Sequence, residues 1–293
     1  MTRPAGQGRL GDVLRTRTPT RVLTPSDLDA ALGLCARNPA DNVFVAARLL
    51  EAGMAGPGQS VVGYEEDGQL QSLCFAGANV VPVETTAYTR GPIADRVRKW
   101  NRRAASFLGP AEQVLGMWEL LESGWPNVRA VRSNQPHLAT RTPPSRLGVV
   151  GDERVRRARP GEVDLVLPAA EHMFTHEIGY PPYRGSSRGY RSLLQRLLDQ
   201  GHTYVIVENG RVIFKADLGS VALDCAQIQG VWVSPELRGH GLGTSAMAAV
   251  VEHVLADVAP LATLYVNDFN TAARTTYERI GMTQIGTFAT VLM

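Results

Sequence analysis

Hydrophobic positions follow two periods along this chain, one typical of strands and one typical of helices. The clearest helical period covers residues 244–256, where Val250 and Val254 fall on one face. The clearest pair of strands is 204–208 and 211–217, which an Asn-Gly turn joins. Because the two patterns are interleaved along the chain, they predict an α/β protein of mixed α+β type with a mixed sheet.

The predicted elements occur twice in the same order: a strand, two helices, three strands, a helix, a strand, a helix and a strand. The repeat is one of element order and not of residue identity. In the first half, strands are expected near residue 21 and at 60–65, 69–75, 79–83, 105–108 and 128–133, with helices at 28–36, 38–50, 93–103 and 111–123. In the second half, strands are expected at 155–158, 204–208, 211–217, 226–233, 263–266 and 283–292, with helices at 163–176, 188–200, 244–256 and 272–280.

The repeat predicts two domains in tandem, at residues 21–139 and 153–293. Residues 140–152 are rich in Pro, Arg and Gly and are predicted to link them. Residues 1–20 show no periodicity and are predicted to form a flexible tail.

Candidate binding chemistry is concentrated where the strand ending at Val233 meets the helix starting near Thr244. In the turn between them, Gly239, Gly241 and Gly243 alternate with other residues. Glycines lack Cβ atoms and let backbone N–H groups converge, and a helix N-terminus adds positive potential. The turn therefore predicts a site for phosphate groups.

Three kinds of phosphate loop compete for this turn. A Walker loop requires lysine before its final Ser or Thr, and residues 242–244 contain none. A dinucleotide fingerprint has the spacing Gly-x-Gly-x-x-Gly early in a βαβ unit, whereas this turn has Gly-x-Gly-x-Gly and lies late in the chain. The third kind is the acyl-CoA loop of the GNAT acyltransferases. Residues 231–243 resemble its pattern Val-x-Val-x-Pro-x-x-Arg-Gly-x-Gly-x-Gly at every position.

A second block supports the resemblance to the GNAT family. Asn270, Ala273, Tyr277 and Gly281 have the spacing of the family pattern Asn-x-x-Ala-x-x-x-Tyr-x-x-x-Gly-Phe, with Met282 in place of Phe. The resemblance implies two GNAT-like domains in tandem, each a mostly antiparallel twisted sheet flanked by helices. It also implies that acetyl-CoA is the cofactor.

The first half resembles the family only in its element order. The strand ending at Val83 is followed by Glu84 and by residues 85–88, without glycine and without the Arg-x-x-Gly-x-Gly spacing. An acidic turn without glycine does not suit a diphosphate. The first half is therefore predicted to be a degenerate GNAT-like domain with a structural or substrate-shaping role.

The resemblance also implies which residues bind the cofactor. Backbone groups of Val231 and Val233 would bind the pantetheine arm, and backbone N–H groups of residues 238–244 would bind the diphosphate. Asn270 would either contact the arm or cap the following helix. The predicted cofactor-binding residues are Val231, Trp232, Val233, Arg238, Gly239, His240, Gly241, Leu242, Gly243, Thr244 and Asn270.

Two residues are candidates for catalysis. Tyr277 matches the family's general acid, which would protonate the departing sulfur, although a packed helix tyrosine is the alternative. Glu177 is the preferred general base, because Gly179 and two prolines would fix the segment beside it. The other candidate bases are His176, Asp217 and Asp224.

Composition limits the other functions. Thirty basic and twenty-eight acidic residues give a net charge of +2, which favours neither nucleic-acid nor membrane-surface binding. Three cysteines without CxxC spacing argue against disulfides and zinc and suit a reducing cytoplasm. Only Lys99 and Lys215 are lysines, which reflects either codon bias or a use of arginine to bind anions.

These features predict an acetyl-CoA-dependent N-acetyltransferase that acts on a primary amine of a small molecule or peptide, by direct attack in a ternary complex. A non-catalytic acyl-CoA-binding protein and an enzyme for a different acyl group are the alternatives. The acceptor and the oligomeric state stay open.

Overall fold

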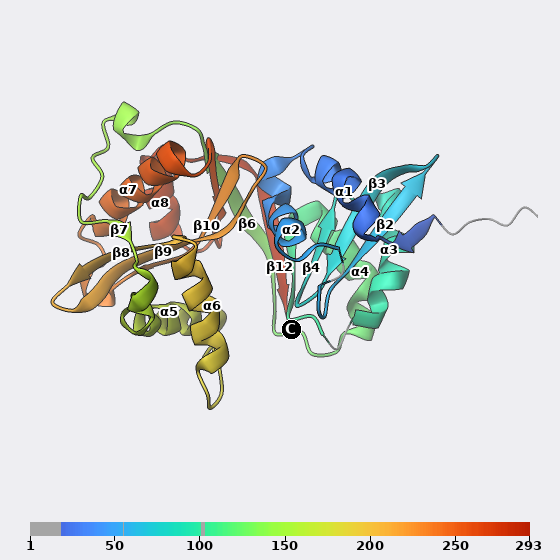
Figure 1. Cartoon of the computed structure of the whole chain (residues 1–293), viewed down its shortest axis with the longest axis horizontal. Coiled ribbons are helices and arrows are strands. Elements are labelled where there is room, and N and C mark those ends of the chain that lie inside the picture. Colours follow the sequence, from blue (N-terminus) through green and yellow to red (C-terminus); the bar gives the residue numbers. More distant parts are fainter. Residues whose placement is uncertain (1–18, 55, 101–102) are drawn as a thin grey trace, which may run out of the picture.

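All described strands join in one continuous sheet in the computed structural model, which describes residues 19–54, 56–100 and 103–293 (Figure 1). Almost all of the predicted tail lies outside these residues. The order across the sheet is β1-β2-β3-β4-β5-β12-β6-β11-β10-β9-β8-β7. The strands are β1 Thr20–Val22, β2 Ser60–Glu66, β3 Gln69–Ala76, β4 Asn79–Val83, β5 Ser106–Pro110, β6 Ala130–Thr140, β7 Arg156–Arg157, β8 Thr203–Glu208, β9 Arg211–Ala222, β10 Cys225–Val233, β11 Leu261–Tyr265 and β12 Thr283–Leu292.

Helices cover both faces of the sheet in each half (Figure 1). In the second half, α7 and α8 pack on one face, and α5 and α6 pack on the other around Val166, Leu198 and Trp232. In the first half, α1 and α2 share one core and α3 and α4 share another. The helices are α1 Leu28–Cys35, α2 Pro39–Ala52, α3 Ala87–Val97, α4 Ala111–Leu121, α5 Val163–Ile178, α6 Arg188–Asp199, α7 Leu242–Asp257 and α8 Thr271–Arg279, with short 3₁₀ turns at Pro25–Asp27, Arg98–Trp100, Glu122–Gly124, Pro144–Leu147, Pro160–Glu162 and Pro235–Leu237.

The two halves exchange their last strands. β6, from the first half, lies between β11 and β12 of the second half and is antiparallel to both. β12, from the second half, pairs in turn with β5 of the first half, so the C-terminus lies near the middle of the molecule (Figure 1). The mixed α/β architecture with mostly antiparallel pairing is confirmed. The division at residues 139 and 153 stays a prediction, and the backbone pairing crosses it.

Side chains also connect the two halves. Helix α2 covers Ala222, Cys225 and Leu261 of the second half, and Arg48 on it donates a hydrogen bond of 3.1 Å to the Gly219 carbonyl. Under α2, the fully buried His137 of β6 lies between Asp41 Oδ1 at 3.1 Å and Thr263 Oγ1 at 2.6 Å. The halves therefore pack as one unit around β6 and β12.

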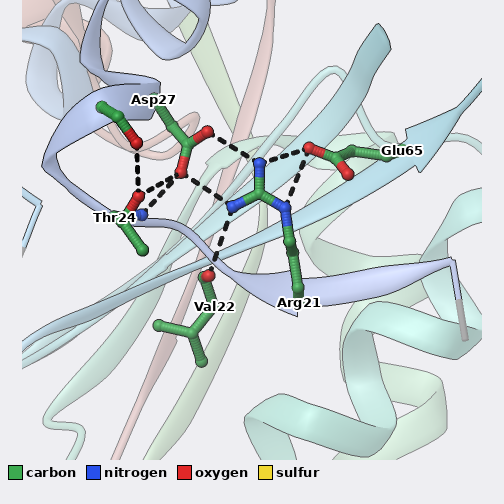
Figure 2. Close-up of polar contacts among 6 residues, drawn as sticks. Arg21, Val22, Thr24, Asp27 and Glu65 are labelled. Carbon is green, nitrogen blue, oxygen red and sulfur yellow. Dashed lines mark hydrogen bonds and ion pairs between the residues drawn. The ribbon is translucent and has the colours of Figure 1, made fainter. Parts of the chain in front are cut away.

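The start of the described chain is held by a charged cluster (Figure 2). Arg21 on β1 donates to both carboxylate oxygens of Asp27 at 2.7 Å, and its Nε donates to Glu65 on β2 at 3.0 Å. The hydrogen bonds from Arg21 lower the pKa of the Asp27 carboxyl. Because the pKa is lowered in the folded state, the stability from this contact is present above the ordinary pKa and is lost as the pH falls.

One predicted helix begins earlier than expected. The helix expected at 93–103 is α3, which begins at Ala87 because Thr86 caps it, with the Thr86 side chain accepting from the Thr89 N–H. Pro92 lies inside α3, which the sequence pattern did not allow for. Within the described ranges, none of the helices combines the length and the apolar character needed to cross a membrane.

Candidate active site

Strands β10 and β11 separate partway along their length and leave a cavity between them. They pair in parallel only over residues 225–227 and 261–263. Beyond this point their ends line a cavity of about 790 Å³, together with α5, α7, α8 and the loop before α8. An unpaired gap between parallel strands exposes backbone groups of both strands to a ligand.

Residues 238–244 form the turn that leads into α7 and the first residues of that helix, and most of them line this cavity. We refer to this segment as the glycine loop. Gly241 has φ +88°, which only glycine adopts without strain, and α7 begins immediately after it. In the described part of the chain, the backbone N–H groups of residues 239–243 donate to no protein acceptor. Several unpaired donors at the N-terminus of a helix fit a diphosphate.

Most of the predicted cofactor-binding residues line the cavity, but their side chains do not all face it. Arg238 donates from its Nε to the Val233 carbonyl at 3.0 Å and so closes the turn. His240 is exposed, and Leu242 packs against the core beside α7. Contacts from these two positions would therefore come from their backbone. The predicted residues that line the cavity are Val231, Trp232, Val233, Arg238, Gly239, Gly241, Gly243, Thr244, Asn270, Tyr277 and Glu177.

Trp232 connects β10 to the helix that carries the candidate base. Its indole N–H donates to His172 Nδ1 on α5 at 3.0 Å. The ring is 8% exposed and belongs to the core between the sheet and α5. This contact fixes α5 against β10 beside the cavity.

Asn270 caps α8, which is one of the two roles left open from the sequence. Its Oδ1 accepts from the Ala273 N–H at 3.2 Å. The residue also lines the cavity, so capping fixes an amide there. The neighbouring Asn267 accepts a bond of 3.0 Å from Gln135 on β6, so the first half also holds this loop.

Glu177 and Tyr277 both line the cavity. The Glu177 side chain is exposed at the cavity wall, and desolvation of its carboxyl by the protein around it raises its pKa above the ordinary 4.5. Burial, with a smaller contribution from the Glu177 charge, raises the pKa of the Tyr277 hydroxyl. The site thus holds a carboxyl that can accept a proton and a hydroxyl that stays protonated.

A strand of the first half holds the segment that carries Glu177. Arg132 on β6 donates to the Glu177 backbone carbonyl at 2.5 Å, at the end of α5. Arg129 lies over the Tyr180 ring at 4.3 Å. The position of the candidate base therefore depends on the strand exchange between the halves.

Two of the alternative bases are wrong on geometric grounds. Asp217 is 4% exposed and is ion-paired with Lys215, so it is not free to accept a proton from a ligand. Asp224 precedes β10, and at about 3.3 Å per residue it lies roughly 13 Å from Ile228, the first cavity-lining residue of that strand. His176 lines the cavity beside Glu177 and stays a candidate.

Sequence patterns missed several lining residues. Tyr265, at the end of β11, lines the cavity, and burial raises its pKa to about 12. Phe269 lies on the loop before α8, is 73% exposed and also lines the cavity. Tyr265 lies near the end of the strand predicted at 263–266, five positions before Asn270, where the second motif block begins, and this position was the available signal. Phe269 is an isolated exposed aromatic residue, and no pattern around it indicated that it lines the cavity.

The corresponding place in the first half is closed. Strands β4 and β5 also pair only at their first residues, but the turn after β4 bonds to its own surroundings. The Thr85 N–H donates to Gln113 Oε1 at 2.8 Å, and Glu84 accepts from Asn38 and Asn42 at 2.8 and 2.9 Å. This turn places the hydrogen-bonded carboxylate of Glu84 where the glycine loop has unpaired N–H groups.

A buried arginine fills the space behind that turn. Arg90 on α3 is 7% exposed, pairs with Glu112 on α4 and crosses above Gly116. A Cβ added at Gly116 would lie 2.1 Å from an Arg90 nitrogen, so the two helices meet through this side chain. The geometry agrees with the prediction of a degenerate first half.

Residues 170–282 match the Acetyltransferase (GNAT) family, and residues 59–166 match a domain of unknown function, DUF4081. The second half of the chain is thus similar to the GNAT acetyltransferases, whose cofactor is acetyl-CoA.

Solved structures support the tandem arrangement. A tandem GNAT protein from the clavulanic acid biosynthesis pathway has a TM-score of 0.56 at 15% identity, over 92% of this chain and 97% of that one. A GCN5-related N-acetyltransferase from Sphaerobacter thermophilus has a TM-score of 0.58 at 17% identity, over 93% of this chain and 94% of that one. At these identities the similarity concerns the fold.

One curated relative matches over a short stretch. Mycothiol acetyltransferase from Streptomyces griseus is 47% identical over 53 residues, which are 18% of this chain. The match spans 17% of the length of that relative. It therefore concerns a local stretch and not the whole protein.

Titration with acetyl-CoA is expected to saturate at one ligand per chain. The glycine loop offers unpaired N–H groups, whereas the turn after β4 uses its own N–H groups and presents Glu84. Isothermal titration calorimetry measures the number of sites. A second equivalent of bound acetyl-CoA would contradict the closed first half.

Proposed function

We propose that this protein transfers an acetyl group from acetyl-CoA to a primary amine by direct attack in a ternary complex. The observation that carries the proposal is a cavity lined both by the glycine loop, with its unpaired N–H groups, and by Glu177 and Tyr277. The glycine loop suits the diphosphate of the cofactor, and the two side chains provide a base and an acid. A protein that only binds acyl-CoA needs the glycine loop alone.

The residues of the chain would act as follows. Backbone N–H groups of the glycine loop hold the diphosphate, and the open edges of β10 and β11 orient the arm of the cofactor. Glu177 accepts the proton that the acceptor amine loses. Tyr277 donates its proton to the sulfur as the bond between that sulfur and the acetyl carbon breaks.

Direct attack is favoured over a covalent enzyme intermediate by the state of the cysteines. Cys35, Cys74 and Cys225 are all buried, and burial raises the pKa of each thiol to about 12. Such thiols do not form the thiolate that a carrier of acyl groups needs. Initial rates at varied concentrations of both substrates should therefore give intersecting and not parallel lines in a double-reciprocal plot.

The proposed acceptor is a small molecule or a peptide, and the proposed location is the cytoplasm. Deprotonation at pH 7 costs about 1 kcal/mol for an α-amine and about 4.5 kcal/mol for a lysine-like amine. A carboxyl with a raised pKa can accept a proton from an α-amine more easily than from a lysine-like amine. The first acceptors to test are therefore α-amines. The name of the mycothiol acetyltransferase that matches locally supports acetyl as the transferred group.

The test is release of free CoA together with the mass of the acetylated product, over a panel of α-amines and side-chain amines. Release above the rate of hydrolysis with at least one amine supports the proposal. Tight binding of acetyl-CoA without release for any amine would instead indicate a binding protein. The mass of a thioester that copurifies with the protein distinguishes acetyl from other acyl groups.

Replacement of Glu177 by Gln is expected to lower kcat/KM at pH 7 by about 10- to 100-fold, because the amine loses its proton acceptor. In the wild type, kcat/KM should rise with pH through the pKa of Glu177, which lies above 4.5, and this rise should be absent in the variant. Rate measurements from pH 5 to 9 test this.

Glu171→Gln is the matched control for this substitution. Glu171 lies on the same helix and bonds to the Tyr183 hydroxyl. Its loss should leave the pH profile unchanged. An unchanged profile in Glu177→Gln as well would show that Glu177 is a charge at the rim and not the base.

A further inference from the structure

A fully buried lysine, Lys215, contacts the cavity-lining residue Gly230 from the side away from the cavity. The chain contains thirty Lys and Arg residues, and Lys215 is one of only two lysines. Its side chain on β9 is 0% exposed, and the side chain of its partner Asp217, two residues along, is 5% exposed. Residues two apart on a strand share a face, so Lys215 and Asp217 lie side by side on the same face of the sheet.

Both members of the pair also form hydrogen bonds to neighbouring strands. Lys215 Nζ donates to Asp217 Oδ2 and, at 3.4 Å, to the Gly230 carbonyl on β10. The other carboxylate oxygen of Asp217 accepts from Thr203 Oγ1 on β8 at 2.8 Å. A compact ammonium fits between these oxygens, whereas a planar guanidinium needs more space.

The pair lies where β10 carries a bulge. Asp217 is opposite Gln229, and Lys215 is opposite Trp232, so three steps along β10 face two along β9. Gly230 in the bulge has φ +59°, and a Cβ there would lie 3.0 Å from Asp217 Oδ2 and 3.2 Å from Lys215 Nζ. An extra residue of this kind re-aims the backbone locally.

The bond to Gly230 sets the direction of the next peptide N–H. In a trans peptide, the carbonyl and the following N–H point in opposite directions. Since the Gly230 carbonyl points at the buried Lys215, the Val231 N–H points away from it. Gly230 and Val231 both line the cavity, whereas Lys215 does not.

Stability does not account for this pair. Desolvation of two buried charges costs about as much as their attraction returns, and well-packed apolar residues in their place are often as stable. The residues directly opposite Lys215 on the neighbouring strands, Val205 on β8 and Trp232 on β10, are buried and belong to the apolar core under α5. An ion pair kept among them points to a role at the bulge.

We propose that Lys215 and Asp217 form a positioning pair: Lys215 holds the Gly230 carbonyl, keeps the β10 bulge in place and orients the Val231 N–H toward the bound substrate. The proposal rests on the acetyltransferase function above. Neither residue touches the substrate. Asp217 acts through Lys215, and Lys215 acts through the Gly230–Val231 peptide and through its charge on Glu177.

The charge effect on Glu177 has a definite sign. Lys215 lowers the pKa of Glu177, against the larger effect of burial, so loss of its charge should raise that pKa further. Lys215→Met alone, which removes only the positive charge, should therefore move the rise of kcat/KM with pH to higher pH. The groups that face Glu177 are Arg132 from β6, His176 from α5, Lys215 from β9, Tyr265 from β11 and Tyr277 from α8.

The test compares a double variant, Lys215→Met with Asp217→Leu, with the wild type. An apolar pair of similar volume should fold, which thermal unfolding checks. Its Kd for acetyl-CoA should stay within about threefold, because the glycine loop is unchanged, while kcat falls at least about tenfold. Because one positive and one negative charge are removed together, the pH profile should move little, and a crystal structure should show Gly230 outside the positive-φ region.

Thr203→Val is the matched control, since it removes a hydrogen bond to Asp217 and leaves the bond from Lys215 to Gly230. It should lower stability and leave kcat within about twofold. A double variant with unchanged kcat, or a control with the same loss of kcat, would overturn the proposal. If the wild type acetylates no amine, the proposed function fails, and the φ angle of Gly230 in the double variant still decides the positioning role.

Discussion

Replacement of Tyr277 by Phe is expected to lower kcat for acetyl transfer by about 100-fold and to leave the Kd for acetyl-CoA within about threefold. General acid catalysis contributes about 10²- to 10⁴-fold, and a thiol of pKa about 8.5 is a moderate leaving group, so the lower end of this range applies. Tyr277 is 6% exposed and lines the cavity from α8. Its raised pKa keeps the hydroxyl protonated at every pH at which the amine is reactive.

Tyr265→Phe is the matched control, because both tyrosines line the same cavity and burial raises the pKa of both. Steady-state kinetics and calorimetry on both variants separate the two roles. The loss of kcat should be confined to Tyr277→Phe. Equal turnover in the two variants would mean that Tyr277 only packs against the core.

Replacement of Gly241 by Ala is expected to raise the Kd for acetyl-CoA at least about tenfold. The residue has φ +88°, where a Cβ strains the backbone by about 1 kcal/mol or more. No protein atom lies within 4 Å of the added Cβ, so the substitution causes no clash within the protein. The loss would come from a changed direction of the N–H groups and from the methyl group in the space of the ligand.

Gly210→Ala separates strain from ligand binding. Gly210 is at the tip of the β8–β9 hairpin, has φ +73° and also has no protein atom within 4 Å of an added Cβ. Both variants should lose a similar free energy of unfolding, which thermal unfolding measures. Only Gly241→Ala should weaken binding of acetyl-CoA. The same Kd in both variants would place the diphosphate away from the glycine loop.

Local patterns of the sequence predicted most elements and one end of the site. The helix expected at 244–256 is α7, and the hairpin around Asn209 and Gly210 is formed by β8 and β9. Both follow from interactions between residues close in the chain, such as the helical period and the positive φ of the turn. The glycine loop belongs to the same class, because its unpaired N–H groups follow from consecutive residues.

Long-range pairing could not be predicted in the same way. The pattern at residues 128–133 predicts a strand, which is the first part of β6, and says nothing of its neighbours, so the placement of β6 between β11 and β12 was not foreseen. Asp217 was expected to be available as a base because charged residues are mostly exposed. It is buried by its pairing with Lys215 and by the packing of α5 over β9 and β10.

The amino-acid order alone thus specifies the glycine loop, the helix behind it and the tyrosine that follows at the family spacing, since each depends on backbone conformations set by a few adjacent residues. Folding in three dimensions brings Arg132 and Lys215 close to Glu177 from separate elements. Their mutual charges depend on distances that no local pattern contains. The same is true of the exchanged strands, because hydrogen bonds between strands join residues more than a hundred positions apart.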